Sequence, residues 1–142
     1  MSVEIKAIDQ MHYEKETPLL WQIYNQEMGV VFSKNVYYFS IILENTEIGF
    51  LRIDVRGGVA YLDDIIIKSE YRGQKIGYEG VEFFMNFSKE KRCHKMRIKT
   101  CPELSPAAYH IYVKLGFVEE ARLKKDYFGH DWVILAKFLD NK

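Results

Sequence analysis

The chain has 142 residues, of which 48% are hydrophobic and 15% aromatic, and this is enough apolar side chain for the core of one domain. Its 20 Lys and Arg residues equal its 20 Asp and Glu residues, so the net charge favours neither nucleic acid nor a membrane surface as a partner. The opening MSVEIKAIDQ has no cationic stretch leading into an apolar run, and the apolar runs are too short to span a membrane. We therefore expect a single cytoplasmic domain over residues 1–142.

The cysteines and histidines predict no metal site. Cys93 and Cys101 do not form a close pair, although His94 adjoins one of them, and we expect two free thiols in a reducing compartment. The histidines have no mutual spacing typical of metal ligands, so we interpret them as ordinary surface or packed residues. They are His12, His94, His110 and His130.

In the first half of the chain, residues 3–8 predict a strand. Apolar residues then recur at helical spacing and predict helical turns between residues 18 and 31. Two segments rich in β-branched and aromatic residues, 36–43 and 48–55, flank four intervening residues and predict a hairpin. Two glycines then turn the chain into a strand over residues 61–67, so that three strands follow one another in antiparallel succession.

In the second half, a helix is predicted over about residues 76–89, with glycines on one face that let it approach a sheet closely. A short strand follows over residues 96–100. A second helix, 106–115, is stopped by a glycine, and residues 117–123 and 132–138 predict two closing strands. The predicted order is therefore βαβββαβαββ.

Residues 70–80, EYRGQKIGYEG, join a predicted strand to a predicted helix. The backbone N–H groups and the positive dipole end of a helix thus follow a cationic, glycine-bearing turn, which predicts an anionic ligand such as a phosphate. Lys75 is followed by Ile76 instead of Ser or Thr, which excludes a Walker loop, and the glycine spacing excludes the G-x-G-x-x-G dinucleotide fingerprint. The alternative is a cationic helix start that is merely solvated.

Two segments resemble the signatures of the GNAT superfamily of acyl-coenzyme A N-acetyltransferases. The loop is similar to the family's pattern of Arg or Gln, two residues, Gly, one residue, and Gly or Ala; Arg72 and Gly77 stand at its ends, and Lys75 occupies the inner Gly position. Residues 105–117, SPAAYHIYVKLGF, resemble the later signature, in which Ser105 replaces the usual Asn. The positions that match are Ala108, Tyr112, Lys114, Gly116 and Phe117.

This resemblance implies the GNAT fold, an α/β (α+β) architecture whose mixed, mostly antiparallel central sheet is flanked by helices. It also implies acetyl-coenzyme A as co-substrate, with its pyrophosphate on the loop and its pantetheine arm on the backbone at the end of the 61–67 strand. Lys75 keeps the N–H that binds a phosphate, but a left-handed φ would cost a non-glycine residue roughly 1 kcal/mol. The implied coenzyme-binding residues are Ile65, Ile66, Ile67, Arg72, Gly73, Gln74, Lys75, Ile76, Gly77, Tyr78, Ser105, Ala108 and Tyr112.

Tyr112 falls at the position of the family's general acid. After an amine attacks the thioester, the departing thiolate gains from a proton donor, and a phenol with a reference pKa of about 10 can supply the proton. The alternative is a tyrosine that only packs in the core, since the chain has 10 tyrosines.

Two carboxylates, Asp63 and Asp64, stand in an apolar strand where charged residues are otherwise out of place. Because side chains alternate along a strand, we expect one of them on each face of the sheet. Resemblance to aminoglycoside-type relatives, whose acidic residue lies four positions before the last residue of the strand, selects Asp63 as the group that holds or deprotonates the amine. The alternative is a solvated strand-end carboxylate.

The expected function is transfer of an acetyl group to a primary amine by direct attack in a ternary complex, without a covalent enzyme intermediate. The sequence leaves open whether the acceptor is a small-molecule amine or an amine of a protein. It also leaves open whether the chain forms a homodimer. A competing hypothesis is a non-catalytic acyl-coenzyme A sensor, motivated by Lys75 and Ser105. The basic stretch between residues 89 and 99 suggests nucleic acid, but it lacks an aromatic platform and is interpreted as a solvated surface.

Overall fold

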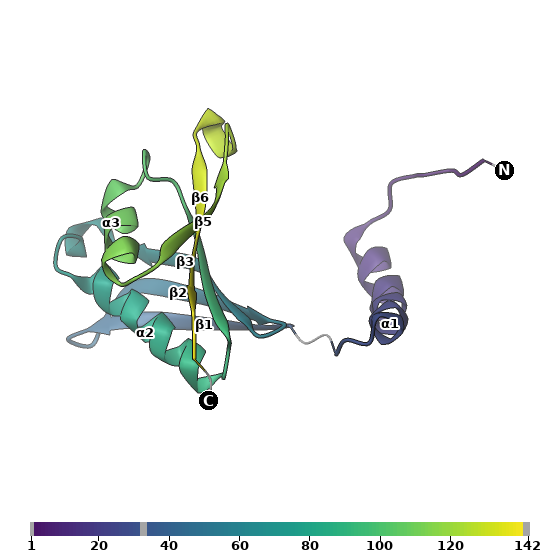
Figure 1. The fold of residues 1–142 in the computed structure, drawn as a ribbon, viewed down its shortest axis with the longest axis horizontal. Coiled ribbons are helices and arrows are strands. Elements are labelled where there is room, and N and C mark those ends of the chain that lie inside the picture. The colour runs from purple at the N-terminus through teal and green to yellow at the C-terminus, as the bar shows by residue number, and fades with distance from the viewer. Residues whose placement is uncertain (1, 32–33, 141–142) are drawn as a thin grey trace. The chain divides into compact units, whose positions relative to one another are not determined.

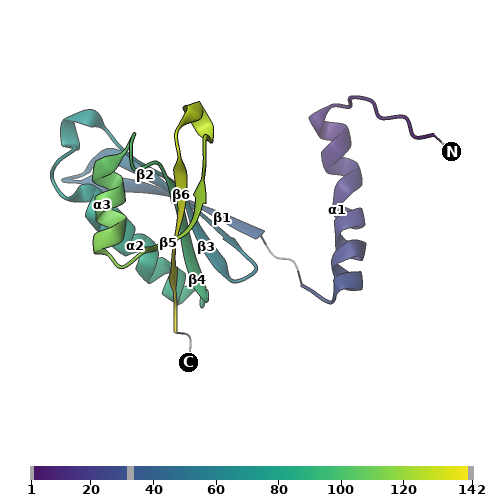
Figure 2. The same cartoon turned by 45° about the horizontal axis from the view of Figure 1, so that its top comes forward.

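A computed structural model describes residues 2–31 and 34–140 of the chain (Figures 1 and 2). The chain divides into two compact units, residues 1–33 and 34–142. None of the described helices is long and apolar enough to cross a membrane. The prediction of one domain over the whole chain stays a prediction.

The first unit contains one helix, α1 (Gln10–Met28). It begins after Asp9, whose side chain accepts a hydrogen bond from the His12 N–H at 2.8 Å, and it ends at Gly29 in the left-handed conformation. The helix therefore starts well before Pro18, because Asp9 caps it there. The predicted strand over residues 3–8 is wrong: this segment has no regular structure, and an extended segment without a paired strand is not stable.

The second unit is built on a sheet of six strands in the order β1-β2-β3-β4-β6-β5. Among the strands of residues 34–140, only β3 and β4 pair in parallel, so the predicted mixed, mostly antiparallel sheet is confirmed. The order along this unit, βββαβαββ, matches the prediction from its second strand onward. The strands are β1 (Lys34–Leu43), β2 (Thr46–Arg56), β3 (Val59–Ile67), β4 (Lys95–Thr100), β5 (Val118–Leu123) and β6 (Trp132–Phe138).

Two helices, α2 (Ile76–Glu90) and α3 (Pro106–Lys114), lie on one face of this sheet (Figure 1). Alternate strand residues point toward them and form the core together with Phe84 of α2, which is 0% exposed. The residues between them point to the opposite face, which we call the outer face. The core-facing strand residues are Leu51, Ile53, Ala60, Leu62, Met96, Ile98, Val133 and Leu135.

The strands β3 and β4 separate soon after they begin to pair. Their ladder ends at the pair Tyr61–Arg97, yet β3 continues to Ile67 alongside β2, and β4 continues to Thr100 alongside β6. Beyond the last pair, the two facing strand edges have no ladder with each other. Because buried backbone groups need hydrogen-bond partners, this separation leaves donors and acceptors for something other than the sheet.

A β-bulge at Asp63 changes which face the end of β3 presents. Arg52 of β2 pairs with Asp64, whereas the next residue of β2, Ile53, pairs with Leu62. One extra residue is thus inserted in β3, and Ile65 points toward the helices although it lies three positions after core-facing Leu62. The bulge turns Ile65 and Ile67 toward the side on which α2 begins.

The close approach of β2 to the end of β3 gives a first prediction. A Cβ on Gly49 would lie 2.5 Å from the Ile66 carbonyl oxygen, which is backbone and cannot move aside cheaply. We expect Gly49→Ala to lower the free energy of unfolding by about 1–3 kcal/mol, as overpacking does. Chemical denaturation measures this.

The control is Gly57→Ala, at a turn where a Cβ would meet nothing within 4 Å but the φ of +57° is left-handed. It should cost only about 1 kcal/mol. Equal losses in the two variants would show that the approach of β2 to β3 at Gly49 is not needed.

Candidate functional site

The loop between β3 and α2 is fixed at both ends. A short 3-10 turn (Ser69–Tyr71) follows β3, and the Arg72 Nε donates a hydrogen bond to the Ile67 carbonyl oxygen at 3.0 Å. Gly73 then has a φ of +82°, and Lys75 a φ of 62° and a ψ of 13°. Lys75 therefore does adopt the left-handed conformation in which a side chain is strained.

The helix α2 starts without a side-chain cap. Lys75 occupies the N-cap position, and its side chain makes no capping hydrogen bond. The first backbone bond of the helix runs from the Glu79 N–H to the Lys75 carbonyl oxygen at 3.1 Å. The N–H groups of residues 76–78 precede this bond, so they form a potential anion site at the positive end of the helix dipole.

The start of α2 lies against the end of β3 and against α3. A Cβ on Gly77 would be 3.7 Å from Ile67 and 3.6 Å from Ile111, which is ordinary contact distance. The Lys114 Nζ lies 5.9 Å from the centre of the Tyr78 ring, which also joins α2 to α3. The structure thus brings the loop, the end of β3 and α3 together.

Other residues predicted for the coenzyme site lie around this junction. Ser105 is the N-cap of α3 and accepts a backbone hydrogen bond from the Tyr109 N–H, and Ala108 packs against the core. Ile66 lies apart from this group, because it is 54% exposed and occupies the opposite strand face from Ile65. Gln74 lies exposed on the loop.

Tyr112 of α3 is buried, with 5% of its surface exposed, and its ring meets the edge of Phe117 at 6.4 Å between centres. Burial raises the pKa of its phenol to about 12. The phenol is therefore protonated at neutral pH and can act as a donor. The same burial supports the alternative of a core residue, because Tyr112 belongs to the hydrophobic cluster around Phe84.

Asp63 faces Arg52 across the β2–β3 ladder, with the Arg52 Nη1 3.2 Å from the Asp63 Oδ2. Arg52 also binds Asp54, at 3.2 Å. Burial raises the pKa of the Asp63 carboxyl; Arg52 opposes this shift, and Asp64 and Asp54 add to it. A half-buried carboxylate that is disfavoured in its charged form is suited to receive a second cation.

The expectation that Asp63 and Asp64 point to opposite faces is wrong. The β-bulge interrupts the alternation at this place, and Asp64 pairs with Arg52, the residue that contacts Asp63. Residues opposite each other in a ladder share a face, so both carboxylates lie on the outer face. Sequence reasoning also missed Arg52, since nothing in one sequence marks a partner across a ladder.

The outer face next to the strand separation carries several interacting charges and rings. The Arg97 guanidinium lies 5.6 Å from the centre of the Tyr61 ring. The pKa of the Tyr61 phenol is raised by burial and next by Asp63; Lys99 and Arg97 lower it, and Tyr127 raises it. Tyr61 therefore lies within electrostatic reach of Asp63, Arg97, Lys99 and Tyr127.

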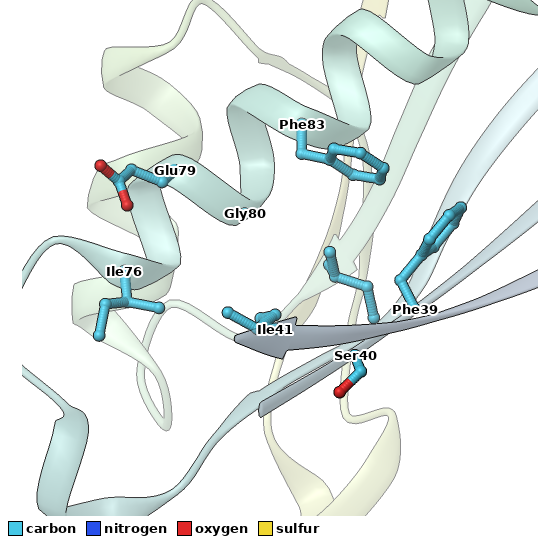
Figure 3. Close-up of a pocket in the computed structure, with 8 residues that line it drawn as sticks. Phe39, Ser40, Ile41, Ile76, Glu79, Gly80 and Phe83 are labelled. Atoms are coloured by element: carbon cyan, nitrogen blue, oxygen red, sulfur yellow. The ribbon is translucent and has the colours of Figure 1, made fainter. Parts of the chain in front are cut away.

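One cavity touches this junction at Ile76, and another lies apart from it. An apolar cavity of about 230 Å³ lies between α2 and the first two strands, with Phe83 and Phe39 at one end and Ile76 at the other (Figure 3). A polar cavity of about 360 Å³ lies near the β5–β6 connection, where the His130 Nδ1 is 2.8 Å from Glu103. Neither is lined by Tyr112 or Asp63, although Ile76 of the first cavity is among the residues predicted for the coenzyme.

The chain is similar to known acetyltransferases in sequence and in fold. The model of the acetyltransferase (GNAT) family matches residues 4–117. A candidate glucosamine 6-phosphate N-acetyltransferase from Oryza sativa subsp. japonica is 34% identical over 76 residues, which cover 52% of this chain and 43% of that protein. The match thus spans less than half the length of this relative.

Solved structures show the same fold at low identity. A candidate acetyltransferase from Agrobacterium tumefaciens has a TM-score of 0.78 at 20% identity, over 98% of this chain and 100% of that one. An acetyltransferase from Bacillus cereus has a TM-score of 0.75 at 15% identity, over 96% and 98%. A candidate streptothricin acetyltransferase from Bacillus anthracis, in complex with acetyl coenzyme A, has a TM-score of 0.66 at 22% identity, over 75% and 64%.

The left-handed Lys75 gives a prediction about stability. Lys75→Gly and Lys75→Ala both remove the side chain, but only glycine relieves the strain of a φ of 62°. We expect the glycine variant to be more stable than the alanine variant by about 1 kcal/mol, measured by chemical denaturation.

The same pair of substitutions at the neighbouring Gln74, which is not among the described residues with positive φ, is the control. There alanine should be at least as stable as glycine, because glycine loses more entropy on folding. The same sign at both positions would contradict a strained Lys75.

Proposed function

Because the chain belongs to the GNAT acetyltransferase family, we propose that it transfers the acetyl group of acetyl-coenzyme A to a primary amine by direct attack in a ternary complex. The amine nitrogen attacks the thioester carbonyl carbon, the C–S bond breaks, and the sulfur leaves as a thiolate that takes up a proton. The observation that carries the proposal is the separation of β3 from β4 beyond the Tyr61–Arg97 pair, with an uncapped helix N-terminus at the end of β3.

The pyrophosphate is proposed to bind the N–H groups at the start of α2. Residues 76–78 offer these groups before the first helical hydrogen bond, and Lys75 adds a side-chain cation beside them. Arg72 supports the site by tying the loop to β3 through the Ile67 carbonyl oxygen, 3.0 Å from its Nε. Anion binding would also offset the unfavourable placement of cations at a helix N-terminus.

The pantetheine arm is proposed to lie in the strand separation. Its amide groups would pair with the β3 edge that faces away from β2, as another strand would. The side chains of Ile65 and Ile67 point toward the helices and would pack against the arm. A donor from this edge would also polarise the thioester carbonyl.

Tyr112 is proposed to stabilise the departing sulfur. With a pKa of about 12, the phenol is a weaker acid than an ordinary tyrosine. Transfer of the Tyr112 proton is therefore unfavourable until negative charge has developed on the departing sulfur. A hydrogen bond from the phenol to the sulfur supplies the larger part of the stabilisation. The sulfur takes up its proton later, when the tetrahedral intermediate collapses and the nitrogen releases its second N–H proton.

On the outer face, Asp63 is proposed to hold the ammonium group of the acceptor and to take one of its protons, directly or through water, so that the neutral nitrogen can attack. Its carboxylate is half-buried, with 29% of the side chain exposed. Arg52 forms ion pairs with both Asp63 and Asp54. The family relative named above acts on an amino sugar phosphate according to its name, which is consistent with a small-molecule amine. A protein amine is the other acceptor class.

A second candidate function is an acyl-coenzyme A binding module without transfer activity. The observation in its favour is the burial of Tyr112 in the hydrophobic cluster, since a residue that only packs would lie there as well. A coenzyme that binds and is never turned over would identify this function.

The experiment that separates the two functions is release of free thiol from acetyl-coenzyme A across a panel of primary amines. It is paired with the shift of the melting temperature by acetyl-coenzyme A, which reports binding alone. Gly77→Asp places a carboxylate beside the proposed pyrophosphate and should abolish this shift. Gly77→Ala fits at ordinary contact distance and should keep it. A full shift in a folded Gly77→Asp protein would remove the loop from the site.

Replacement of the phenol tests the donor. Tyr112→Phe keeps the ring in the core and should lower turnover by roughly 10²- to 10⁴-fold, the usual contribution of one acid–base group, while the affinity for acetyl-coenzyme A stays unchanged. Since the pKa of Tyr112 is about 12, its ionisation should cause no fall in rate below about pH 11. Turnover within about twofold of the parent would reassign Tyr112 to packing.

Removal of the Asp63 charge tests the acceptor side. Asp63→Asn should raise the acceptor KM by about two- to fivefold, the scale of one partly exposed ion pair, and leave coenzyme binding unchanged. The pKa of Asp63 is raised, so the parent's acceptor affinity should increase as the pH rises through it, and the variant should lose this dependence.

The stability of the Asp63 variant has a definite sign. A carboxyl whose folded pKa is raised adds stability below its unfolded pKa and loses it as the pH rises through the folded value, so Asp63→Asn should not destabilise the fold at neutral pH.

Asp54→Asn, at the other carboxylate of Arg52, is the control for the effect on the acceptor KM. An equal rise in acceptor KM there would assign the effect to Arg52.

A further inference from the structure

The connection between β5 and β6 is a strained segment at the edge of the outer face. It contains a short 3-10 turn (Tyr127–Gly129), and both Lys125 and Phe128 have a left-handed φ, of 49° and 61°. Bulky residues rarely adopt this conformation unless their surroundings fix it. The contacts that hold the connection are therefore informative.

Lys99 of β4 makes three contacts that reach this connection. Its Nζ lies 2.8 Å from the Asp126 Oδ2, 4.0 Å from the centre of the Tyr127 ring and 5.6 Å from the Trp132 ring. The two rings meet edge to face at 5.6 Å, and the Trp132 Nε1 donates to the Tyr127 carbonyl oxygen at 2.9 Å. A single ammonium group thus joins the central strand to a carboxylate and two rings.

Asp126 depends on Lys99. Its Oδ2 is buried and, among the described side chains, has no hydrogen-bond partner of good geometry, so the Lys99 ammonium is the charge that compensates it. Although 30% of the Asp126 side chain is exposed, this oxygen is not, so removal of Lys99 leaves it without a compensating cation. The connection would then lose its charged contact with β4.

Tyr127 lies beside the part of β4 that borders the strand separation. Its ring contacts Lys99, which follows the last β3–β4 pair, Tyr61–Arg97, by two residues. Its phenol and Asp63 also both act electrostatically on Tyr61. One part of the Tyr127 ring meets Lys99, yet Tyr127 is 60% exposed. An exposed aromatic ring can receive an alkylammonium group by cation–π attraction.

We propose that Lys99 is a positioning residue that latches the β5–β6 connection so that the Tyr127 ring and Asp63 together receive a cationic primary alkylamine. This inference rests on the proposed function for its substrate and on the contacts of Lys99 for the latch. Lys99 itself does not touch the acceptor.

Lys95 offers a matched control on the same strand. Its Nζ forms an ion pair with Glu120 of β5 at 2.7 Å and lies 5.2 Å from the Phe138 ring, but these contacts do not reach residues 124–131. Lys95→Met and Lys99→Met therefore remove the same charge and the same kinds of contact. They differ in the segment that is released and in the one further ring contact of Lys99.

Hydrogen–deuterium exchange tests the latch without activity. We expect Lys99→Met to speed exchange of residues 124–131 by about tenfold or more, and Lys95→Met to leave it unchanged. Lys99→Arg should largely retain slow exchange, because its guanidinium keeps the charge. Unchanged exchange in Lys99→Met would overturn the latch, whatever the activity.

Kinetics test the role of the latch. With an alkylamine acceptor, Lys99→Met should raise the acceptor KM by about tenfold and leave the affinity for acetyl-coenzyme A within about twofold, as expected for a lost acceptor contact. Tyr127→Leu should raise the acceptor KM as well. An acceptor KM that stays at the parent value while exchange is fast would overturn the proposal.

Two further measurements keep the outcomes distinct. If Lys99→Met does not fold, the double variant Lys99→Met/Asp126→Asn removes the uncompensated carboxylate, and it should fold with fast exchange and a raised acceptor KM; a parent-like KM in it overturns the proposal. If the parent releases no thiol with any amine, the proposed function fails and the acceptor role falls with it, while exchange still decides the latch.

Discussion

The separation of β3 from β4 is the constraint on which the rest of the structure depends. The two strands pair over only three residues and then follow different neighbours, β3 along β2 and β4 along β6. Neither can turn back without losing a ladder, and the close approach at Gly49 fixes β2 to the end of β3. The exposed strand edges therefore persist as a property of the sheet, and a ligand with amide groups can satisfy them.

Two of the strained backbone positions of the second unit lie in the loops that flank the candidate site. Lys75 is left-handed where α2 begins, and Phe128 is left-handed in the connection that reaches the outer face. Each is fixed by neighbours: the Arg72–Ile67 hydrogen bond anchors the first loop, and Lys99 anchors the second. Strained positions that are over-determined in this way concentrate at binding sites, because they hold polar groups where secondary structure would not.

The sequence predicted the elements of the second unit within a few residues, because glycines and alternating apolar residues mark their limits. It placed Lys75 correctly at a position that can require a left-handed φ. It failed for residues 3–8, since an alternating pattern does not reveal whether a partner strand is present. One sequence does not specify which residues face each other across neighbouring strands. It therefore does not reveal the bulge at Asp63 or the ion pairs of Arg52 and Lys99.

Tyr112 shows why core and site are hard to separate in this fold. Its ring packs with Phe117 inside the hydrophobic cluster, and this packing is what raises the pKa of its phenol to about 12. A more exposed tyrosine would be a better acid but would be solvated, and water would compete for the sulfur. The buried phenol keeps its proton at every physiological pH and is held by the core at one end of α3. Packing and proton donation are therefore compatible demands on the same side chain, and burial alone does not argue against the chemistry.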